Sequence, residues 1–397
     1  MFAGFISRRK AMSRLVAFAA LAWVTACGPV VMSGQTAGGA DTPRIDPGAP
    51  VMVALLVPAG SADASDTFIA RNLENAARLA ISDLSGVQID LRVYPTAGDP
   101  ARAASAAAAA VNDGARIILG PVYAEEANAA GVAIAGTGIS LLAFSNNPTI
   151  AGGNVFILGP TFRNTADRLV RYGLRTGIDS YMIVHSDDLQ GVVGRDAIAS
   201  AVRNAGAQVA GIQSYPLSQE GILATAPRIV AATQAAGADG LFLTAGVNSD
   251  LPYLATALPE NGLPPSAVRY LGLTRWNAVP QALALPGLQG GLFALPDQQM
   301  SGLFDGRYTA AFGEAPHPLA GLAYDGIAAI GALVARGDTT ALSRGALTQG
   351  QGFQGTAGIF RLLTDGTNER GLAVAEVRNN QVVILESAPR SFGGAGF

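Results

Sequence analysis

The chain has 397 residues, enough for two domains that each bury a sizeable hydrophobic core. Hydrophobic residues make up 49% of it and charged residues 14%, a composition that indicates a compact globular protein rather than a disordered one. With a net charge of −3, the chain offers no broad positive field for nucleic acid. One cysteine cannot form an intrachain disulfide, and two histidines cannot make a histidine-rich metal site. We therefore expect no nucleic-acid partner, no metal and no cofactor.

The first 26 residues predict a cleaved signal peptide. Basic residues up to Arg14 precede the apolar run Leu15–Trp23, which is too short to span a bilayer. The following residues, Val24-Thr25-Ala26-Cys27-Gly28, resemble the lipobox of bacterial lipoproteins. The resemblance implies that Cys27 carries lipid; the alternative is an ordinary secretory signal with a cysteine nearby. Because Gly28 is not the aspartate that often retains lipoproteins at the inner membrane, we expect a periplasmic protein anchored in the outer membrane.

Residues 27–50 are rich in Gly, Ala, Pro, Thr and Ser and predict a flexible tether. The body of the chain then alternates short apolar strands with helical segments, which is typical of parallel sheets covered by helices. We expect strands at Val51–Val57, Gln88–Tyr94, Arg116–Leu119, Leu141–Phe144, Ser180–Val184, Gln208–Tyr215, Gly240–Thr244, Arg269–Thr274 and Gly291–Ala294. We expect helices at about Asp66–Leu84, Pro100–Asn112, Asn164–Leu174, Gly194–Asn204, Pro227–Ala236, Leu303–Phe312 and Leu319–Arg336, with others after Pro121 and from Pro252.

This alternation predicts an α/β fold with two doubly wound lobes joined by hinge strands. The first lobe is expected to comprise residues 51–160 and 297–347, and the second residues 161–296 and 348–387. Segments Gly358–Leu363, Leu372–Arg378 and Val382–Leu385 predict antiparallel hairpins, and residues 388–397 form a tail.

In doubly wound sheets, ligands bind beyond the carboxyl ends of the strands. The loops at these ends, with one residue of a late helix, supply the candidate ligand-binding residues: Gly60, Ser61, Gly120, Pro121, Ser145, Asn146, Asn147, His185, Asp187, Gly246, Thr274 and Tyr324. The cluster at 145–147 could bind a carboxylate or a sugar hydroxyl, or could cap the next turn.

Signatures of catalysis are missing from the sequence. It contains no nucleophile elbow, Walker loop, dinucleotide fingerprint or zinc signature. His185, beside Asp187 and Asp188, is either an acid/base group or a hydrogen-bonded residue that lines the cleft. Glu125 and Glu126 fall in the first turn of a helix, where the helix dipole alone favours carboxylates. We therefore expect a protein that is not an enzyme.

The stretch from Arg116 to Asn147 resembles the core of type 1 periplasmic-binding proteins. In that family a Gly-Pro turn opens a helix, and the next strand ends in Ser, Thr or Asn residues. Further matches are the Tyr324-Asp325 step and the late glycine-rich motif of Phe353, Gly355, Gly358 and Phe360. The resemblance covers roughly residues 51–387. It implies a two-lobed type 1 periplasmic-binding fold, a ligand carboxylate held at residues 145–147, and a mostly structural role for Tyr324-Asp325 near the hinge.

Within that family the chain looks most like the lipoprotein activators of penicillin-binding proteins (LpoA-like). Amino-acid receptors carry an aromatic-Gly step where this chain has Leu189-Gln190-Gly191. For a ligand's ammonium group, only Asp187 and Asp250 are candidates by position. These departures favour a non-catalytic regulator of peptidoglycan synthesis that binds and activates a bifunctional penicillin-binding protein. The alternative is the substrate-binding lipoprotein of an ABC importer, which would hold an amino acid or other small solute in the cleft between the lobes.

Overall fold

The structure is a computed structural model that describes residues 43–393. The predicted signal peptide, Cys27 and most of the predicted tether lie outside these residues. The last part of the tether prediction is wrong, because Ile45 is only 5% exposed and packs in a hydrophobic core. Its amide donates a hydrogen bond to the carbonyl of Thr339 at 2.9 Å.

The first sheet has five parallel strands in the order β2-β1-β3-β4-β5. They are β1 (Val51–Val57), β2 (Ile89–Pro95), β3 (Ile117–Leu119), β4 (Leu141–Ala143) and β5 (Val155–Ile157). Every residue of β1, β3, β4 and β5 is buried, as expected for strands covered on both faces. The sequence analysis missed β5, which is a short strand of three residues.

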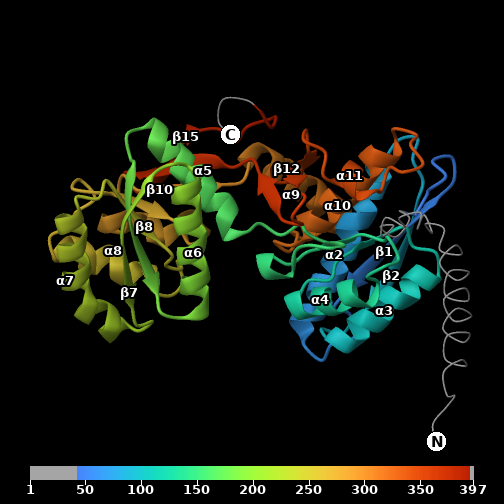
Figure 1. Ribbon diagram of the computed structural model, residues 1–397, viewed down its shortest axis with the longest axis horizontal. Helices are drawn as coiled ribbons and strands as arrows, with labels where there is room; N and C mark the ends of the chain where they lie inside the picture. Colours follow the sequence, from blue (N-terminus) through green and yellow to red (C-terminus); the bar gives the residue numbers. More distant parts are fainter. Residues whose placement is uncertain (1–42, 394–397) are drawn as a thin grey trace, which may run out of the picture. The chain divides into compact units, whose positions relative to one another are not determined.

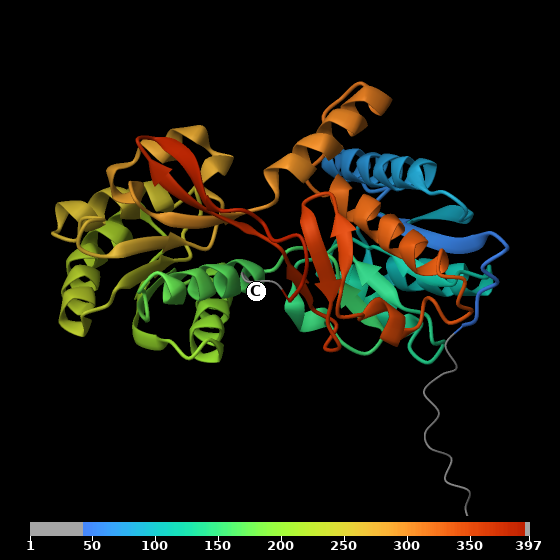
Figure 2. The ribbon, with the colours of Figure 1, turned by 90° about the horizontal axis from the view of Figure 1, so that it is seen from above.

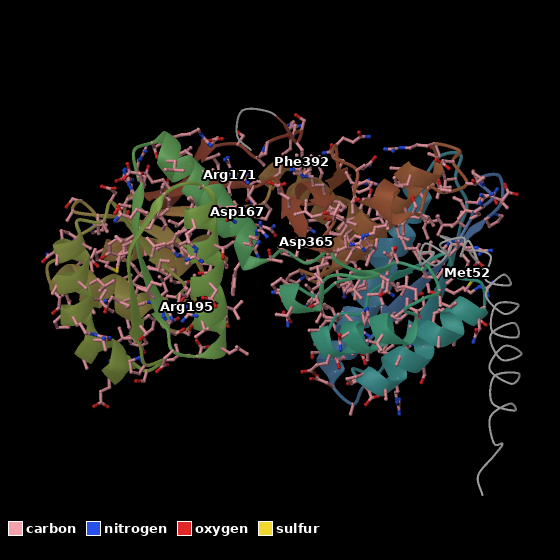
Figure 3. The ribbon with its side chains drawn as sticks, in the orientation of Figure 1. Met52, Asp167, Arg171, Arg195, Asp365 and Phe392 are labelled. Atoms are coloured by element: carbon pink, nitrogen blue, oxygen red, sulfur yellow. The ribbon has the colours of Figure 1, made fainter. Side chains whose placement is uncertain are left out.

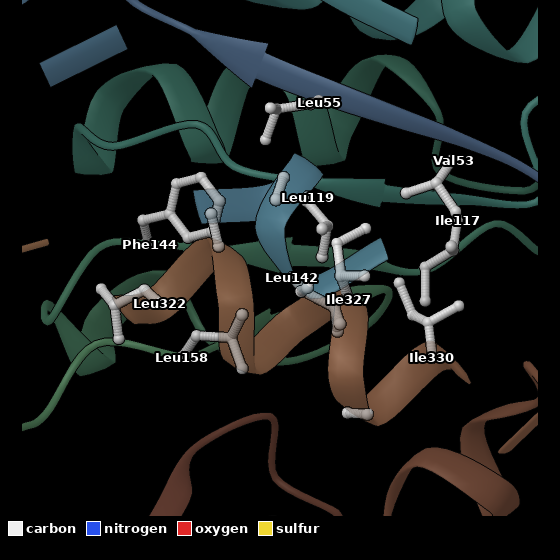
Figure 4. Packing of buried hydrophobic residues seen from close by; sticks show 14 of the residues in the cluster. Val53, Leu55, Ile117, Leu119, Leu142, Phe144, Leu158, Leu322, Ile327 and Ile330 are labelled. Carbon is white, nitrogen blue, oxygen red and sulfur yellow. The ribbon is translucent and has the colours of Figure 1, made fainter. Parts of the chain in front are cut away.

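Helices cover both faces of this sheet (Figure 1). Helices α3 (Pro100–Asn112) and α4 (Ala124–Ala133) lie on one face, and α2 (Ala64–Asp83) and α10 (Ala320–Val334) lie on the other. The start of α3 follows from Asp99, whose carboxylate accepts a hydrogen bond from the Arg102 amide at 2.8 Å, with proline at the first helical position. Figure 4 shows the core between the sheet and α10, where Leu119 and Leu142 pack near Ile327.

The second sheet has seven strands in the order β15-β14-β10-β9-β8-β6-β7. They are β6 (Ser180–Ser186), β7 (Gln208–Tyr215), β8 (Gly240–Leu243), β9 (Arg269–Gly272), β10 (Leu292–Leu295), β14 (Ala373–Arg378) and β15 (Gln381–Glu386). The five strands from β6 to β10 are parallel, and β14 and β15 add an antiparallel hairpin at one edge (Figure 2, red). This hairpin confirms the predicted antiparallel pairing across the turn at Asn379 and Asn380, which both have positive φ.

Helices α5 (Phe162–Arg175) and α6 (Leu189–Asn204) pack on one face of the second sheet. Helices α7 (Gln219–Ala236) and α8 (Leu251–Glu260) pack on the other, together with short 3₁₀ turns at Trp276–Ala278, Pro280–Ala284 and Pro286–Leu288. The predicted start of α7 at Pro227 is wrong. The helix begins after Ser218, whose hydroxyl accepts a hydrogen bond from the Gly221 amide at 3.0 Å, and Pro227 lies inside it.

The chain passes between the two sheets three times: between β5 and α5, between β10 and α9 (Gln298–Phe312), and between β13 (Asn368–Arg370) and β14. The remaining elements are a 3₁₀ turn at Pro148–Ile150, α11 (Arg344–Leu347) and the small antiparallel sheet of β11 (Phe353–Gly355), β12 (Gly358–Leu362) and β13. Phe353 and Phe360 belong to the core of the first sheet. The lobe boundaries stay a proposal, and this packing supports counting residues 353–362 with the first lobe.

Candidate functional site

The loops at the carboxyl ends of β3 and β4 are hydrogen-bonded to each other. The Gly120 amide donates to the Leu142 carbonyl at 2.8 Å, and the Phe144 amide donates to the Pro121 carbonyl at 2.9 Å. The Gly120-Pro121 peptide bond is cis, and Gly120 has a φ of +86°. A side chain at Gly120 would meet the Leu56 carbonyl oxygen, because its Cβ would lie only 2.2 Å away. The structure thus places Gly120 and Pro121 at the predicted edge as a tightly packed, buried turn.

The predicted cluster at 145–147 forms a capped turn with one free side chain. Ser145 is buried, and its hydroxyl accepts a hydrogen bond from the Asn147 amide at 3.1 Å. The Asn147 carboxamide oxygen accepts from the amide of Thr149 at 3.0 Å and from its hydroxyl at 2.8 Å. These bonds support the capping alternative for Ser145 and Asn147. Asn146 is exposed, so its side chain is the member of the cluster that a solute can reach most easily.

The candidate residues at the ends of the second sheet's strands are mostly engaged in local hydrogen bonds. His185 is buried, and its Nδ1 lies 2.7 Å from the Ser186 carbonyl oxygen, to which it can only donate. This contact favours the hydrogen-bonded alternative over an acid/base role. The Asp187 side chain is exposed. The Thr274 hydroxyl donates to the Ala245 carbonyl at 2.8 Å, and the Gly246 amide donates to Asp250 at 2.7 Å.

Asp250, one of two candidates for binding an ammonium group, is committed to its own loop. It is 4% exposed. One carboxylate oxygen accepts from the Gly246 amide and from the Ser249 hydroxyl, both at 2.7 Å, and the other accepts from the Tyr215 hydroxyl. Burial and the neighbouring Asp250 carboxylate raise the pKa of Tyr215, which keeps this phenol protonated. Asp250 therefore stabilises the loop after β8 and has little capacity left for a ligand.

The remaining candidates lie in two different places. Gly60 and Ser61 form the turn after β1, where Gly60 has a φ of +83° and Ser61 accepts a hydrogen bond from the Asp63 amide. Tyr324 lies on α10, and its hydroxyl donates to Asp83 of α2 at 2.5 Å. Tyr324 therefore contacts the helices that cover the first sheet rather than the strand-end loops.

A cavity of about 830 Å³ adjoins the Asn146 and Asn147 loop. Its other walls come from Thr161–Arg163 at the start of α5, from Thr367, and from one side of α6 between Gln190 and Asn204. Phe162 and Val193 give it apolar surface. We call it the α5–α6 cavity. His185 and Asp187, which are also candidate ligand-binding residues, are not among the residues that line it.

Two arginines, Arg163 and Arg203, and one acidic residue line this cavity. Asp196, the only acidic residue that lines it, is 2.7 Å from Arg195, which lies on the same helix (Figure 3). Arg163 is 3.4 Å from Asp167 on α5. Burial raises the pKa of Asp167 above its ordinary value, although the positive charge of Arg163 acts to lower it. Arg203 forms no ion pair with any carboxylate in residues 43–393, so its charge is available to a bound anion.

One group at the edge of the first sheet was missed by the sequence analysis. The Tyr123 hydroxyl, at the start of α4, donates to Asp66 of α2, and the Tyr123 side chain remains 39% exposed. The hydrogen bond to Asp66 and burial raise the pKa of Tyr123 to about 12. Glu126 lies in the first turn of α4, as predicted, but it is fully buried, which the sequence analysis did not anticipate. The available signal was its spacing, because Glu126 and the buried Ala130 share one face of α4.

Residues 43–393 contain no group of three or more His, Cys, Asp or Glu side chains arranged to hold a metal ion. Within the same residues, every helix is too short or too polar to cross a bilayer.

Comparisons with known proteins define the class of this fold. Residues 50–381 match the family described as periplasmic binding protein, and the chain therefore belongs to that family. A search of curated proteins finds no match to the chain. The two lobes have the type 1 periplasmic-binding fold, as the sequence analysis predicted. Membership implies a periplasmic location and a solute-binding, non-catalytic kind of protein.

Solved structures similar to this chain come from several bacteria. A putative branched-chain amino acid ABC transporter protein from Rhodospirillum rubrum is 18% identical, with a TM-score of 0.70, over 85% of this chain and 100% of that chain. A branched-chain amino acid ABC transporter ligand-binding protein from Burkholderia xenovorans is 18% identical, with a TM-score of 0.65, over 87% and 97%. A solute-binding protein from Rhodopseudomonas palustris, in complex with 3,4-dihydroxybenzoic acid, is 17% identical, with a TM-score of 0.53, over 86% and 98%. At these identities the likeness shows the fold alone.

Proposed function

We propose that this protein is the substrate-binding component of an ABC importer and captures a small solute beside the strand-end loops of the first sheet. The α5–α6 cavity carries the proposal, because its volume of about 830 Å³ lies within the range of small-molecule sites. It is bounded by the predicted Asn146 and Asn147 loop and by elements that pack on the second sheet. Transport proteins of this fold that are named for small solutes add support.

The charges in this cavity favour an anionic solute with an apolar part. Arg203 has its charge free, and Arg163 has a partner only at 3.4 Å, whereas the one acidic side chain is already paired with Arg195. A carboxylate would gain charge-assisted hydrogen bonds from these guanidinium groups. Phe162 and Val193 offer apolar contact to the rest of the molecule. We therefore expect an organic acid.

A zwitterionic amino acid fits this site less well than a simple organic acid does. Its ammonium group needs a carboxylate, but Asp250 is buried and already accepts from three donors, and Asp187 does not line the cavity. Leu189, at the position where receptors for amino acids carry an aromatic side chain, is 79% exposed. The solute is therefore proposed to lack an α-ammonium group.

The lack of a carboxylate for an ammonium group also supports a second candidate function, the regulation of peptidoglycan synthesis. A protein that activates a bifunctional penicillin-binding protein needs no ammonium site, and it would act by binding selectively to the active conformation of the synthase. The similar transport proteins favour the importer component, so the regulator is the second choice. In both cases the proposed anchor is lipid on Cys27.

Thermal-shift measurements on the purified chain distinguish the two functions. A panel of aromatic and aliphatic carboxylates and of the common amino acids should raise the melting temperature with one or more carboxylates and with none of the amino acids. At a hundredfold excess over Kd, a ligand that binds only the native state adds about 2.7 kcal/mol to the free energy of unfolding.

Two variants localise the effect. Asn146→Ala and Arg203→Gln should each abolish the shift, whereas Arg116→Gln, which changes an exposed arginine outside the cavity, should leave it unchanged. Absence of a shift with every carboxylate, combined with binding to a purified bifunctional synthase, would reject the importer component and support the regulator. A shift with one amino acid would reject the organic-acid specificity.

A further inference from the structure

A second cavity lies in the first lobe and shares no residue with the α5–α6 cavity. Its volume is about 520 Å³, and it is bounded by α2, α9, α10 and the segment from Gln349 to Thr356. We call it the α9–α10 groove. The function proposed above does not use it.

One side of α10 forms the floor of this groove. Tyr324, Ala328 and Ala332 line it at intervals of four residues, which places them along one face of the helix, and Arg336 lines it from the turn just after the helix ends. The opposite face, which carries Ile327 and Ile330, packs against the first sheet (Figure 4). The face in the groove therefore runs from an aromatic residue, past two small alanines, to a cation. The two alanines leave room for a narrow apolar ligand.

Helix α9 forms an apolar wall of the groove, although Phe304 and Tyr308 of the same helix also pack in or against the core of the first lobe. Tyr308 is the only buried residue of this helix. Met300, Leu303 and Phe304 line the groove from successive positions on one side, and Leu303 is 55% exposed. Covering such an exposed aliphatic side chain with an apolar ligand favours binding, because it removes apolar surface from water.

The two cations that line the groove differ in what they already contact. Arg307 pairs with Asp83 and donates to the Tyr324 hydroxyl. Arg336, in the turn after α10, is exposed and forms no ion pair with a carboxylate in the part of the chain that the structure describes. One end of the groove thus presents a positive charge without an anionic partner.

We propose that the α9–α10 groove binds a single-chain amphiphilic carboxylate of the fatty-acid type. Its acyl chain lies along Ala328 and Ala332 against Leu303, and its carboxylate meets Arg336. The volume is in the range of small-molecule sites, whereas a docked protein segment needs a contact of about 800 Å² on each partner. The uncompensated positive charge selects an anionic head group.

The test is equilibrium dialysis of the purified full chain against radiolabelled dodecanoate below its micellar concentration. Dodecanoate should bind at one site. Decanoate, which is two methylenes shorter, should bind about fifteenfold more weakly, because each buried methylene tightens binding roughly fourfold. Dodecyltrimethylammonium, which has the same chain and the opposite charge, should bind far more weakly than dodecanoate. Equal binding of the two head groups, or the same affinity for both acids, would overturn the proposal.

Variants then assign the binding to this groove. Ala332→Trp fills the floor and Leu303→Asp places a negative charge on the wall, so each should abolish dodecanoate binding. Arg336→Gln should weaken it by about fivefold, the scale of a partly exposed ion pair. The matched controls are Leu217→Asp, at a leucine of the other lobe that is 47% exposed, and Arg116→Gln. Both controls should leave the affinity unchanged.

The result of the dodecanoate test does not depend on whether the protein is the substrate-binding component of an ABC importer. Arg203→Gln in the α5–α6 cavity should not alter dodecanoate binding. If Arg203→Gln abolishes binding while Ala332→Trp and Leu303→Asp do not, the fatty acid occupies the other cavity and the proposal for the groove is rejected. Binding only to anionic vesicles, with none to monomeric dodecanoate, would also reject it.

Discussion

The Arg370 guanidinium lies 3.7 Å from the Asp325 carboxylate, and the two side chains are only 5% and 1% exposed. Arg370 also donates to the Leu158 carbonyl, and Asp325 accepts from the Thr356 amide at 2.6 Å. Two segments that pass between the sheets, the one after β5 and the one after β13, are thereby joined to α10 through one buried pair. These contacts support the prediction that Asp325, in the Tyr324-Asp325 step, has a structural role.

Removing one member of this pair should cost more stability than removing both. Arg370→Met leaves the Asp325 carboxylate buried without its counter-charge, and we expect a loss of about 3–5 kcal/mol in the free energy of unfolding. The double variant Asp325→Leu/Arg370→Met should lose less than Arg370→Met alone, because no buried charge remains. Urea denaturation measures the free energy of unfolding of the single and the double variant. A change under about 1 kcal/mol for Arg370→Met would contradict this account of the pair.

Gly120 should be intolerant of any side chain. Gly120→Ala would bring a Cβ to 2.2 Å from the Leu56 carbonyl oxygen, so the backbone of the strand-end turn must move. Gly60 is the matched control, because it has a similar positive φ of +83° and no atom within 4 Å of the Cβ position. Gly60→Ala should cost about 1–2 kcal/mol from backbone strain alone. Gly120→Ala should cost at least about 2 kcal/mol more in the same urea titration. Equal losses would show that the close contact with Leu56 is relieved without cost.

Several elements could be predicted from the sequence because local chemistry determines them. Asp99 and Pro100 mark the start of α3, and its observed range, Pro100–Asn112, is the predicted one. The start of α7 was misplaced because proline is usually found in the first turn, and Pro227 is an exception inside a helix capped by Ser218.

The candidate site was harder to predict, because cavity walls come from residues distant in the sequence. The rule that ligands bind at the carboxyl ends of strands identified Asn146 and Asn147. It did not identify Arg203, because this residue lies near the C-terminal end of α6 and not in a strand-end loop. It also could not anticipate that Asp250 would be used by Tyr215, a residue of another strand. Such pairings depend on tertiary packing, which a single sequence does not display.

The proposed anchor depends on Cys27, the only cysteine of the chain. Cys27→Ser should remove the acyl chains, which hold a protein on a membrane at about 0.8 kcal/mol per buried methylene. The variant should therefore appear in the soluble fraction or remain unprocessed, whereas the parent chain stays with membranes after a high-salt wash. Cys27→Ser that still fractionates with washed membranes would show that the lipobox interpretation is wrong.

Glu126 should make the protein less stable as the pH rises. Its side chain is fully buried, and burial raises its pKa above the ordinary value of 4.5, with the Asp66 and Asp99 carboxylates acting in the same direction. Below pH 4.5 the carboxyl is protonated in both the native and the unfolded protein. Between that pH and the raised native pKa, only the unfolded state releases the proton, so the free energy of unfolding falls as the pH increases. Above the native pKa the loss is complete, at about 1.4 kcal/mol for each unit by which the two pKa values differ.

Glu126→Gln removes this titration, because the buried amide stays neutral at every pH. We expect the variant to gain stability relative to the parent chain between pH 5 and pH 8, and to show no such gain at pH 4. The matched control is Glu125→Gln at the exposed neighbour in the same helical turn, which should follow the pH profile of the parent chain. Urea titrations of the three proteins at several pH values make the comparison. A parallel profile for Glu126→Gln and the parent would mean that Glu126 ionises in the native protein as readily as in the unfolded one despite its burial, and would contradict this account.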